Sequence, residues 1–147
     1  MQHALLSRPI LSLTLSSFAI GLSEFVTIGL MSPISESLSI GLPETGLLIT
    51  LYAMGVSIGA PSIAYCTRHF SSKTVCLWLI ALFAFANLLS AVTYTFPLLL
   101  LTRIGAGAAH GAFFSVASNL APALVIRDKA PLAIAVMFSG LTLGGCR

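Results

Sequence analysis

The chain has 147 residues, of which 57% are hydrophobic and only 7% are charged, and its mean hydropathy is +1.03. A water-soluble domain carries about 25% charged residues, so this composition excludes an ordinary soluble protein and indicates an integral membrane protein in a lipid bilayer. The net charge of +3 comes from only seven Lys and Arg that form no basic patch, so a nucleic-acid partner is not expected.

Long apolar runs predict four complete membrane spans and a partial fifth. A helix needs roughly 20 residues, at about 1.5 Å each, to cross a bilayer. The last run, from Pro131 to Gly145, has 15 residues and predicts an unfinished helix. The fold class expected is an all-α, polytopic transmembrane helix bundle, with a loop at residues 32–43. The predicted spans cover residues 10–31, 44–65, 75–93, 98–119 and 131–146.

Basic residues are distributed unevenly between the loops. Arg8 precedes the first span, Arg68 and Lys73 lie between the second and third, and Arg127 and Lys129 lie between the fourth and fifth. The other two loops carry no Lys or Arg. Because cytoplasmic loops are enriched in Lys and Arg, we expect the N terminus and the three basic segments on the cytoplasmic side.

Small residues recur at a spacing of four in the second and fourth spans. Gly55 and Gly59 form one such pair, Gly107 and Gly111 form another, and Gly105 begins a further stripe. Glycines one turn apart allow a neighbouring helix to approach backbone to backbone, which is how helices associate in lipid. We therefore expect these five glycines to lie at helix packing faces.

The fourth span carries two ionisable side chains, Arg103 and His110. Together with Gly107, Gly111 and Phe114 they fall on one helical stripe. An Arg inside a membrane is rare and costly, and it is expected to face a protein interior or a wet cavity. For His110 two interpretations stay open, a proton shuttle or a hydrogen bond to a neighbouring helix.

The first span carries an acid, Glu24, that is a candidate partner for Arg103. In the predicted topology Glu24 lies about 10 Å and Arg103 about 8 Å from the outer ends of their helices. We therefore hypothesise that they face each other or share a cavity. A buried acid balanced by a nearby Arg can be neutral or ionised, as proton coupling requires. The alternative is a static ion pair that only fixes helix rotation.

Three segments resemble helices of the major facilitator superfamily. Residues 98–114, LLLLTRIGAGAAHGAFF, resemble the R-x-x-x-G signature of its fourth helix. Residues 21–34, GLSEFVTIGLMSPI, and 46–61 are similar to the first and second helices of its proton-driven drug and sugar efflux branch. The resemblance implies a bacterial inner-membrane antiporter that exports a small molecule in exchange for protons, built from two six-helix halves.

The resemblance also assigns residues. Arg103 and Gly107 match the fourth-helix signature, and Glu24 matches the membrane-embedded acid of the first helix. Arg68 and Lys73 match part of the basic cytoplasmic loop motif, but the Asp that precedes this cluster in the superfamily has no counterpart here. Eight further helices would complete the fold, so we expect a truncated N-terminal part that is inactive alone without the missing C-terminal helices.

Two other classes of protein are alternatives to the transporter. A small helical membrane accessory protein without transport activity remains the alternative. An intramembrane hydrolase is disfavoured, because His110 and Ser115 point roughly 140° apart on one helix and no G-x-S-x-G occurs. Cys66, Cys76 and Cys146 form no C-x-x-C pattern, so neither a metal site nor a cofactor is expected.

Overall fold

The structure is a computed structural model that describes residues 7–145. All regular elements in this range are helical, which confirms the all-α prediction. Cys146, the last residue of the fifth predicted span, lies outside the described residues. The elements are α1 (Arg8–Gly29), α2 (Met31–Leu38), α3 (Leu42–Cys66), α4 (Ser72–Ala91), α5 (Phe96–Ala123), the 3-10 turn η2 (Arg127–Lys129) and α6 (Ala130–Gly145).

Four of these helices, α1, α3, α4 and α5, are long and apolar enough to cross a membrane. They coincide with the four complete spans predicted, although α5 extends a few residues beyond its predicted range at both ends. Pro97 falls in the first turn of α5, where its missing N–H leaves no helical hydrogen bond unmade. The sixth helix, α6, has 16 residues, fewer than the roughly 20 that a crossing needs.

The loop predicted at residues 32–43 is wrong, because most of this segment forms the short helix α2. Pro33 lies in the first turn of α2, where proline is tolerated. The helix ends at Leu38, and the next residue, Ser39, has a left-handed φ of 52°. The N–H groups of Ser39 and Ile40 then donate back to carbonyls of the last turn, as in common helix C-caps.

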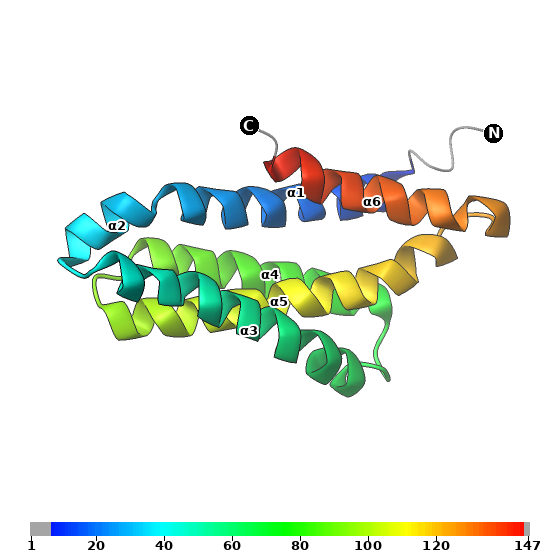
Figure 1. Ribbon diagram of the computed structural model, residues 1–147. Coiled ribbons are helices and arrows are strands. Elements are labelled where there is room, and N and C mark those ends of the chain that lie inside the picture. Colours follow the sequence, from blue (N-terminus) through cyan, green and yellow to red (C-terminus); the bar gives the residue numbers. More distant parts are fainter. Residues whose placement is uncertain (1–6, 146–147) are drawn as a thin grey trace.

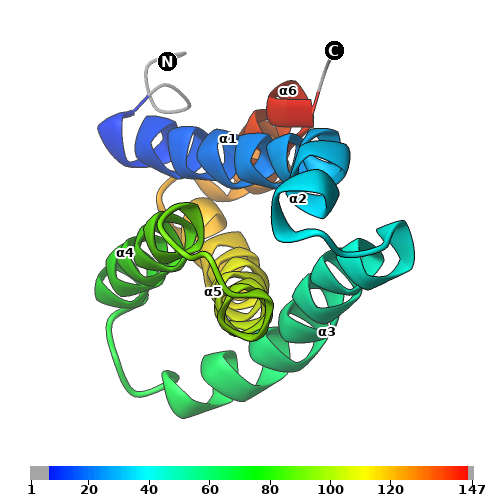
Figure 2. The same ribbon diagram turned by 90° about the vertical axis from the view of Figure 1, so that its left-hand side faces the viewer.

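Helix α5 occupies the centre of the bundle. It packs along α3 on one side and α4 on the other, while α1 pairs with α6 (Figure 1). Seen along the bundle, α3 and α4 flank α5, with α1 and α6 together above it (Figure 2). In its most apolar stretch 56% of the residues of α5 are buried, against 22–28% in the other three spans. The ionisable groups of α5 are therefore surrounded by protein.

Four of the five predicted glycines hold α3 against α5. A Cβ atom added at Gly55 or Gly59 of α3, or at Gly107 or Gly111 of α5, would collide with the backbone of the opposite helix. Gly105 does not belong to this interface, since a Cβ there would meet no atom within 4 Å. Two residues of helix turn Gly105 by about 200° from Gly107, so Gly105 lies on another face of α5.

A second glycine contact, which the sequence analysis did not identify, joins α6 to α1. A Cβ added at Gly140 would collide with the Thr14 carbonyl oxygen, and one at Gly144 with the backbone at Phe18 and Leu22. These two glycines are also one turn apart. Glycines one turn apart therefore allow close packing in both helix pairs, α3 with α5 and α1 with α6.

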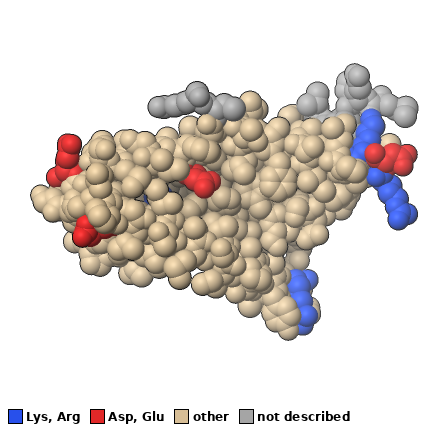
Figure 3. All heavy atoms as spheres, viewed as in Figure 1, with Lys and Arg blue, Asp and Glu red and all other residues tan. Residues whose placement is uncertain are grey.

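The surface agrees with a membrane environment. Figure 3 shows a broad band nearly free of charged atoms between the two ends of the bundle, with Lys and Arg gathered at one end. Large apolar side chains are widely exposed, for example Leu15 at 67%, Phe85 at 62% and Leu88 at 65%. Exposed apolar surface of this extent is unfavourable in water and is satisfied by lipid tails. The chain is an integral membrane protein, as its composition predicts.

Candidate functional site

The buried guanidinium of Arg103 joins three helices. This side chain, on α5, is only 6% exposed. It donates one hydrogen bond to Thr27 Oγ1 of α1 at 2.8 Å and another to Asn87 Oδ1 of α4 at 3.2 Å. Arg103 therefore faces the protein interior, and a hydroxyl and an amide, both uncharged, accept its hydrogen bonds.

Asn87 is the hub of this polar cluster. Its Oδ1 also accepts a hydrogen bond from Ser23 Oγ of α1 at 2.7 Å, and its Nδ2 donates to the Phe83 carbonyl one turn earlier at 2.8 Å. Asn87, Ser23 and Thr27 were not predicted as site residues. The sequence does show an amide and two hydroxyls within apolar spans. Small polar side chains also form hydrogen bonds within their own helix, so their partners cannot be predicted from the sequence.

Glu24 and Arg103 lie on the same small cavity. The cavity has a volume of about 30 Å³ and lies between α1, α3 and α5, with Thr27 and Tyr52 also in its wall. This volume is sufficient for a water molecule. In the described part of the chain, the half-buried Glu24 carboxylate makes no direct ion pair with Arg103, whose hydrogen bonds go to Thr27 and Asn87.

His110 is bonded to a neighbouring helix through its Nδ1 atom, which lies 2.7 Å from Tyr52 Oη of α3. Its ring also packs against Phe114, with the ring centroids 5.1 Å apart. Tyr52 in turn lines the cavity of Glu24 and Arg103. The structure thus brings the three predicted ionisable residues together through a tyrosine that the sequence analysis did not select.

The two residues of the predicted loop motif lie away from this cluster. Arg68 follows the end of α3, with its guanidinium 4.5 Å above the Tyr65 ring and its Nε 3.1 Å from His69 Nε2. Lys73 lies in the first turn of α4. Neither contacts Arg103 or Glu24, so the loop and the polar cluster are separate features of the molecule.

Asn87→Ala is expected to lower the free energy of unfolding by about 1–2 kcal/mol. The variant removes the shared acceptor of Ser23 and Arg103, and hydrogen bonds to charged groups contribute more than the about 0.6 kcal/mol average inside membranes. Asn119→Ala is the matched control, because Asn119 makes the same backbone bond one turn back, to Ser115, but is exposed. It should cost under about 0.5 kcal/mol. Equal losses in detergent unfolding titrations would contradict the hub role.

Four apolar helices, glycine-mediated packing and a buried Arg among polar groups from three helices define a polytopic helical membrane protein with a polar site inside the bundle. The profile of the Major Facilitator Superfamily matches residues 13–146. The chain belongs to this family of membrane transporters.

Several curated proteins are similar to the chain over most of its length. The inner membrane transport protein YdhP of Escherichia coli is 37% identical over 94% of this chain and 36% of its own length. The chloramphenicol resistance protein of Streptomyces lividans is 36% identical over 92% of this chain and 34% of its own length. A probable sugar efflux transporter of Helicobacter pylori is 35% identical over 88% of this chain and 33% of its own length. The chain therefore spans about a third of these relatives. No solved structure matches it.

Proposed function

We propose that the chain forms part of a proton-coupled efflux transporter for small molecules, with Glu24 as the group that takes up and releases the proton. The observation that carries this proposal is the shared cavity of Glu24 and Arg103. Arg103 already donates to Thr27 and Asn87, so its position does not depend on a bond to Glu24. The carboxylate is therefore free to change its charge beside a fixed cation.

A change of charge on Glu24 would alter the attraction between α1 and α5. When ionised, Glu24 is drawn toward the Arg103 guanidinium across the cavity; when protonated, it is neutral and that attraction is lost. A transporter that alternates between two arrangements of its helices can use this difference to favour one arrangement. The Tyr52 hydroxyl lies between this cavity and His110, and we assign it the role of connecting the two.

The names of the relatives support export of small molecules, since one is a probable sugar efflux transporter and another a chloramphenicol resistance protein. We propose a bacterial inner-membrane location with the basic end of the bundle, where α1 begins, on the cytoplasmic side. Because the chain covers about a third of each relative, we expect transport to require further helices. The 147 residues alone should show none.

The test is a chimera in which this chain replaces the 135 matched residues of the chloramphenicol resistance protein. In cells, the chimera should lower chloramphenicol accumulation, whereas the 147-residue chain by itself should not. Size-exclusion chromatography in detergent serves as the control for folding. A folded chimera that exports nothing would contradict the proposed efflux activity and favour a helical accessory role.

A further inference from the structure

Asn87 belongs to a closed ring of hydrogen bonds around Arg103. Arg103 Nη1 donates to Thr27 Oγ1 at 2.8 Å, and Thr27 Oγ1 donates in turn to the Ser23 carbonyl at 2.9 Å. Ser23 Oγ donates to Asn87 Oδ1 at 2.7 Å, and Arg103 Nη2 closes the ring on the same oxygen at 3.2 Å. The ring therefore joins α1, α4 and α5, and it contains one positive charge and no carboxylate.

The chemistry of its partners fixes the orientation of the Asn87 amide. Its Nδ2 donates to the Phe83 carbonyl at 2.8 Å, and a carbonyl oxygen can only accept. Its Oδ1 faces Arg103, whose guanidinium can only donate. A flipped amide would lose both bonds, so the neutral oxygen stays directed at Arg103.

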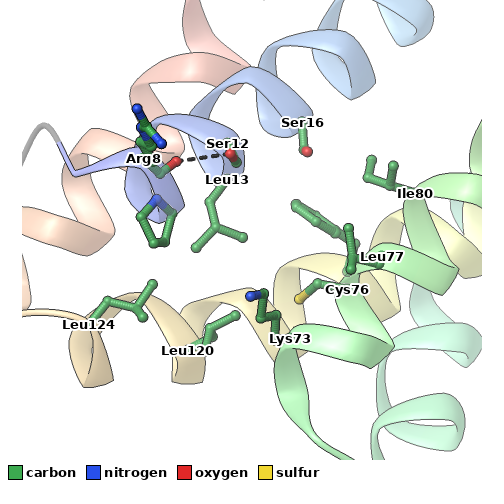
Figure 4. A pocket seen from close by; sticks show the side chains of 12 residues that line it. Arg8, Ser12, Leu13, Ser16, Lys73, Cys76, Leu77, Ile80, Leu120 and Leu124 are labelled. Atoms are coloured by element: carbon green, nitrogen blue, oxygen red, sulfur yellow. Dashed lines mark hydrogen bonds between the residues drawn. The ribbon is translucent and has the colours of Figure 1, made fainter.

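The helix that carries Asn87 is held beside Arg103 by a further contact. One turn along α4, Ser90 Oγ donates to Thr102 Oγ1 of α5 at 2.6 Å. Between α1 and α4 the described residues make one hydrogen bond, from Ser23 to Asn87, and toward the basic end an apolar cavity of about 370 Å³ lies between these two helices (Figure 4). Substitution of Asn87 therefore removes a bond to α1 and one to Arg103 while the bond from Ser90 still joins α4 to α5.

Glu24 is a second acceptor available to Arg103, because both residues line the same small cavity. A guanidinium binds a carboxylate more strongly than it binds a neutral acceptor. In the structure its hydrogen bonds nevertheless go to Thr27 and Asn87. We propose that Asn87 is a positioning residue that competes with Glu24 for Arg103, and so sets the pH at which Glu24 exchanges its proton. This inference rests on the proposed role of Glu24.

Few other groups can influence the charge of Glu24. Among the described residues, Tyr52 of α3 and Arg103 of α5 are the titratable side chains that share its cavity. The helix α6, which packs along α1, carries no titratable side chain between Ala130 and Gly145. In α4 the titratable residues, Lys73 and Cys76, lie in the first two turns, whereas Asn87 lies near the other end. Arg103 is thus the cation that faces Glu24.

Two substitutions of Asn87 are expected to act in opposite directions. Asn87→Leu keeps the size of the side chain but removes the acceptor, so Arg103 turns to the Glu24 carboxylate and favours its ionised form. The pH at which Glu24 is half protonated should then fall by about one unit. Asn87→Asp supplies Arg103 with a permanent counter-charge, so Glu24 is attracted less, and the same midpoint should rise by about one unit.

The test is an infrared titration of the full 147-residue chain in lipid vesicles. The glutamates carry an isotope label, so that the band of their protonated carboxyl groups is separate from that of an introduced Asp. Subtracting the titration of Glu24→Gln leaves the contribution of Glu24, whose midpoint is then compared between the unsubstituted chain and the two Asn87 variants. Each variant has its own expected sign, so either one suffices if the other does not fold.

Ser90→Ala is the matched control, because it removes the neighbouring bond between α4 and α5 but touches neither Arg103 nor Glu24. It should leave the midpoint unchanged. Midpoints that stay the same in both Asn87 variants, or that move in the same direction in both, would overturn the proposal. A shift in Ser90→Ala as large as in Asn87→Leu would also overturn it, since loosening of the helices would then explain the effect.

The infrared titration does not depend on transport, so it separates this inference from the proposed function. Opposite shifts together with a folded chimera that exports nothing would support the role of Asn87 and contradict the proposed efflux activity. Unchanged midpoints together with a chimera whose export depends on Glu24 would overturn the role of Asn87 alone.

Discussion

Replacing Gly107 or Gly111 by Ala is expected to lower the free energy of unfolding by about 1–3 kcal/mol for each substitution. At Gly107 the added Cβ would fall on the carbonyl oxygen of Tyr52, and at Gly111 on that of Val56. Both atoms belong to the backbone of α3, so no side-chain rotation relieves the collision. The two helices must separate, and the close backbone contact between α3 and α5 is then lost.

Gly105→Ala is the matched control on the same helix. A Cβ at Gly105 meets no atom within 4 Å, and Ala is a better helix former than Gly by about 1 kcal/mol. This variant should therefore be as stable as the unsubstituted chain or slightly more so. The unfolding midpoints of all three variants can be compared in one detergent titration. If Gly105→Ala were as damaging as Gly107→Ala, the α3–α5 interface described here would be incorrect.

Much of this fold is predictable because the bilayer imposes a simple rule on sequence. A spanning helix must be long and apolar, so the runs that became α1, α3, α4 and α5 were identifiable from hydropathy alone. The helix within segment 32–43 was not predicted, because the rule for spanning helices does not apply to a segment too short to cross the bilayer. There, residues 31–38 form the short helix α2, with Pro33 in its first turn, where proline is tolerated.

The glycine contacts were predictable in part. A spacing of four identifies a face that can pack, but it does not say whether a helix lies on that face. Gly107 and Gly105 have the same local pattern, yet only Gly107 is covered by α3. Gly140 and Gly144 show the same pattern in the short run that became α6, and their partner, α1, lies more than 100 residues away in sequence.

The polar cluster was predictable only through its charges. Arg103 and Glu24 stand out in apolar runs because a charge in lipid is costly. Their depth, estimated from the distance to the helix ends, was enough to suggest a shared cavity. Asn87 and Tyr52 carry no charge, and the choice between lipid-facing and interior positions depends on helix rotation, which only packing determines. The hydrogen bond from Arg103 to Asn87 is therefore a finding of the structure.

Glu24→Gln is expected to abolish the effect of a proton gradient on transport while leaving the transporter folded. The substitution keeps the shape of the side chain but removes its ability to gain or lose a proton beside Arg103. If one proton is exchanged for each substrate, a ten-fold proton gradient sustains at most about a ten-fold substrate gradient. In Glu24→Gln this accumulation should disappear, and substrate should only equilibrate.

The most direct measurement compares two modes of transport by the chloramphenicol resistance chimera in proteoliposomes. One is accumulation of labelled chloramphenicol driven by a pH gradient, and the other is exchange of labelled for unlabelled chloramphenicol without a gradient. Our account predicts that Glu24→Gln loses the first mode and keeps the second. Accumulation by Glu24→Gln equal to that of the unsubstituted chimera would contradict the proposal that Glu24 carries the proton.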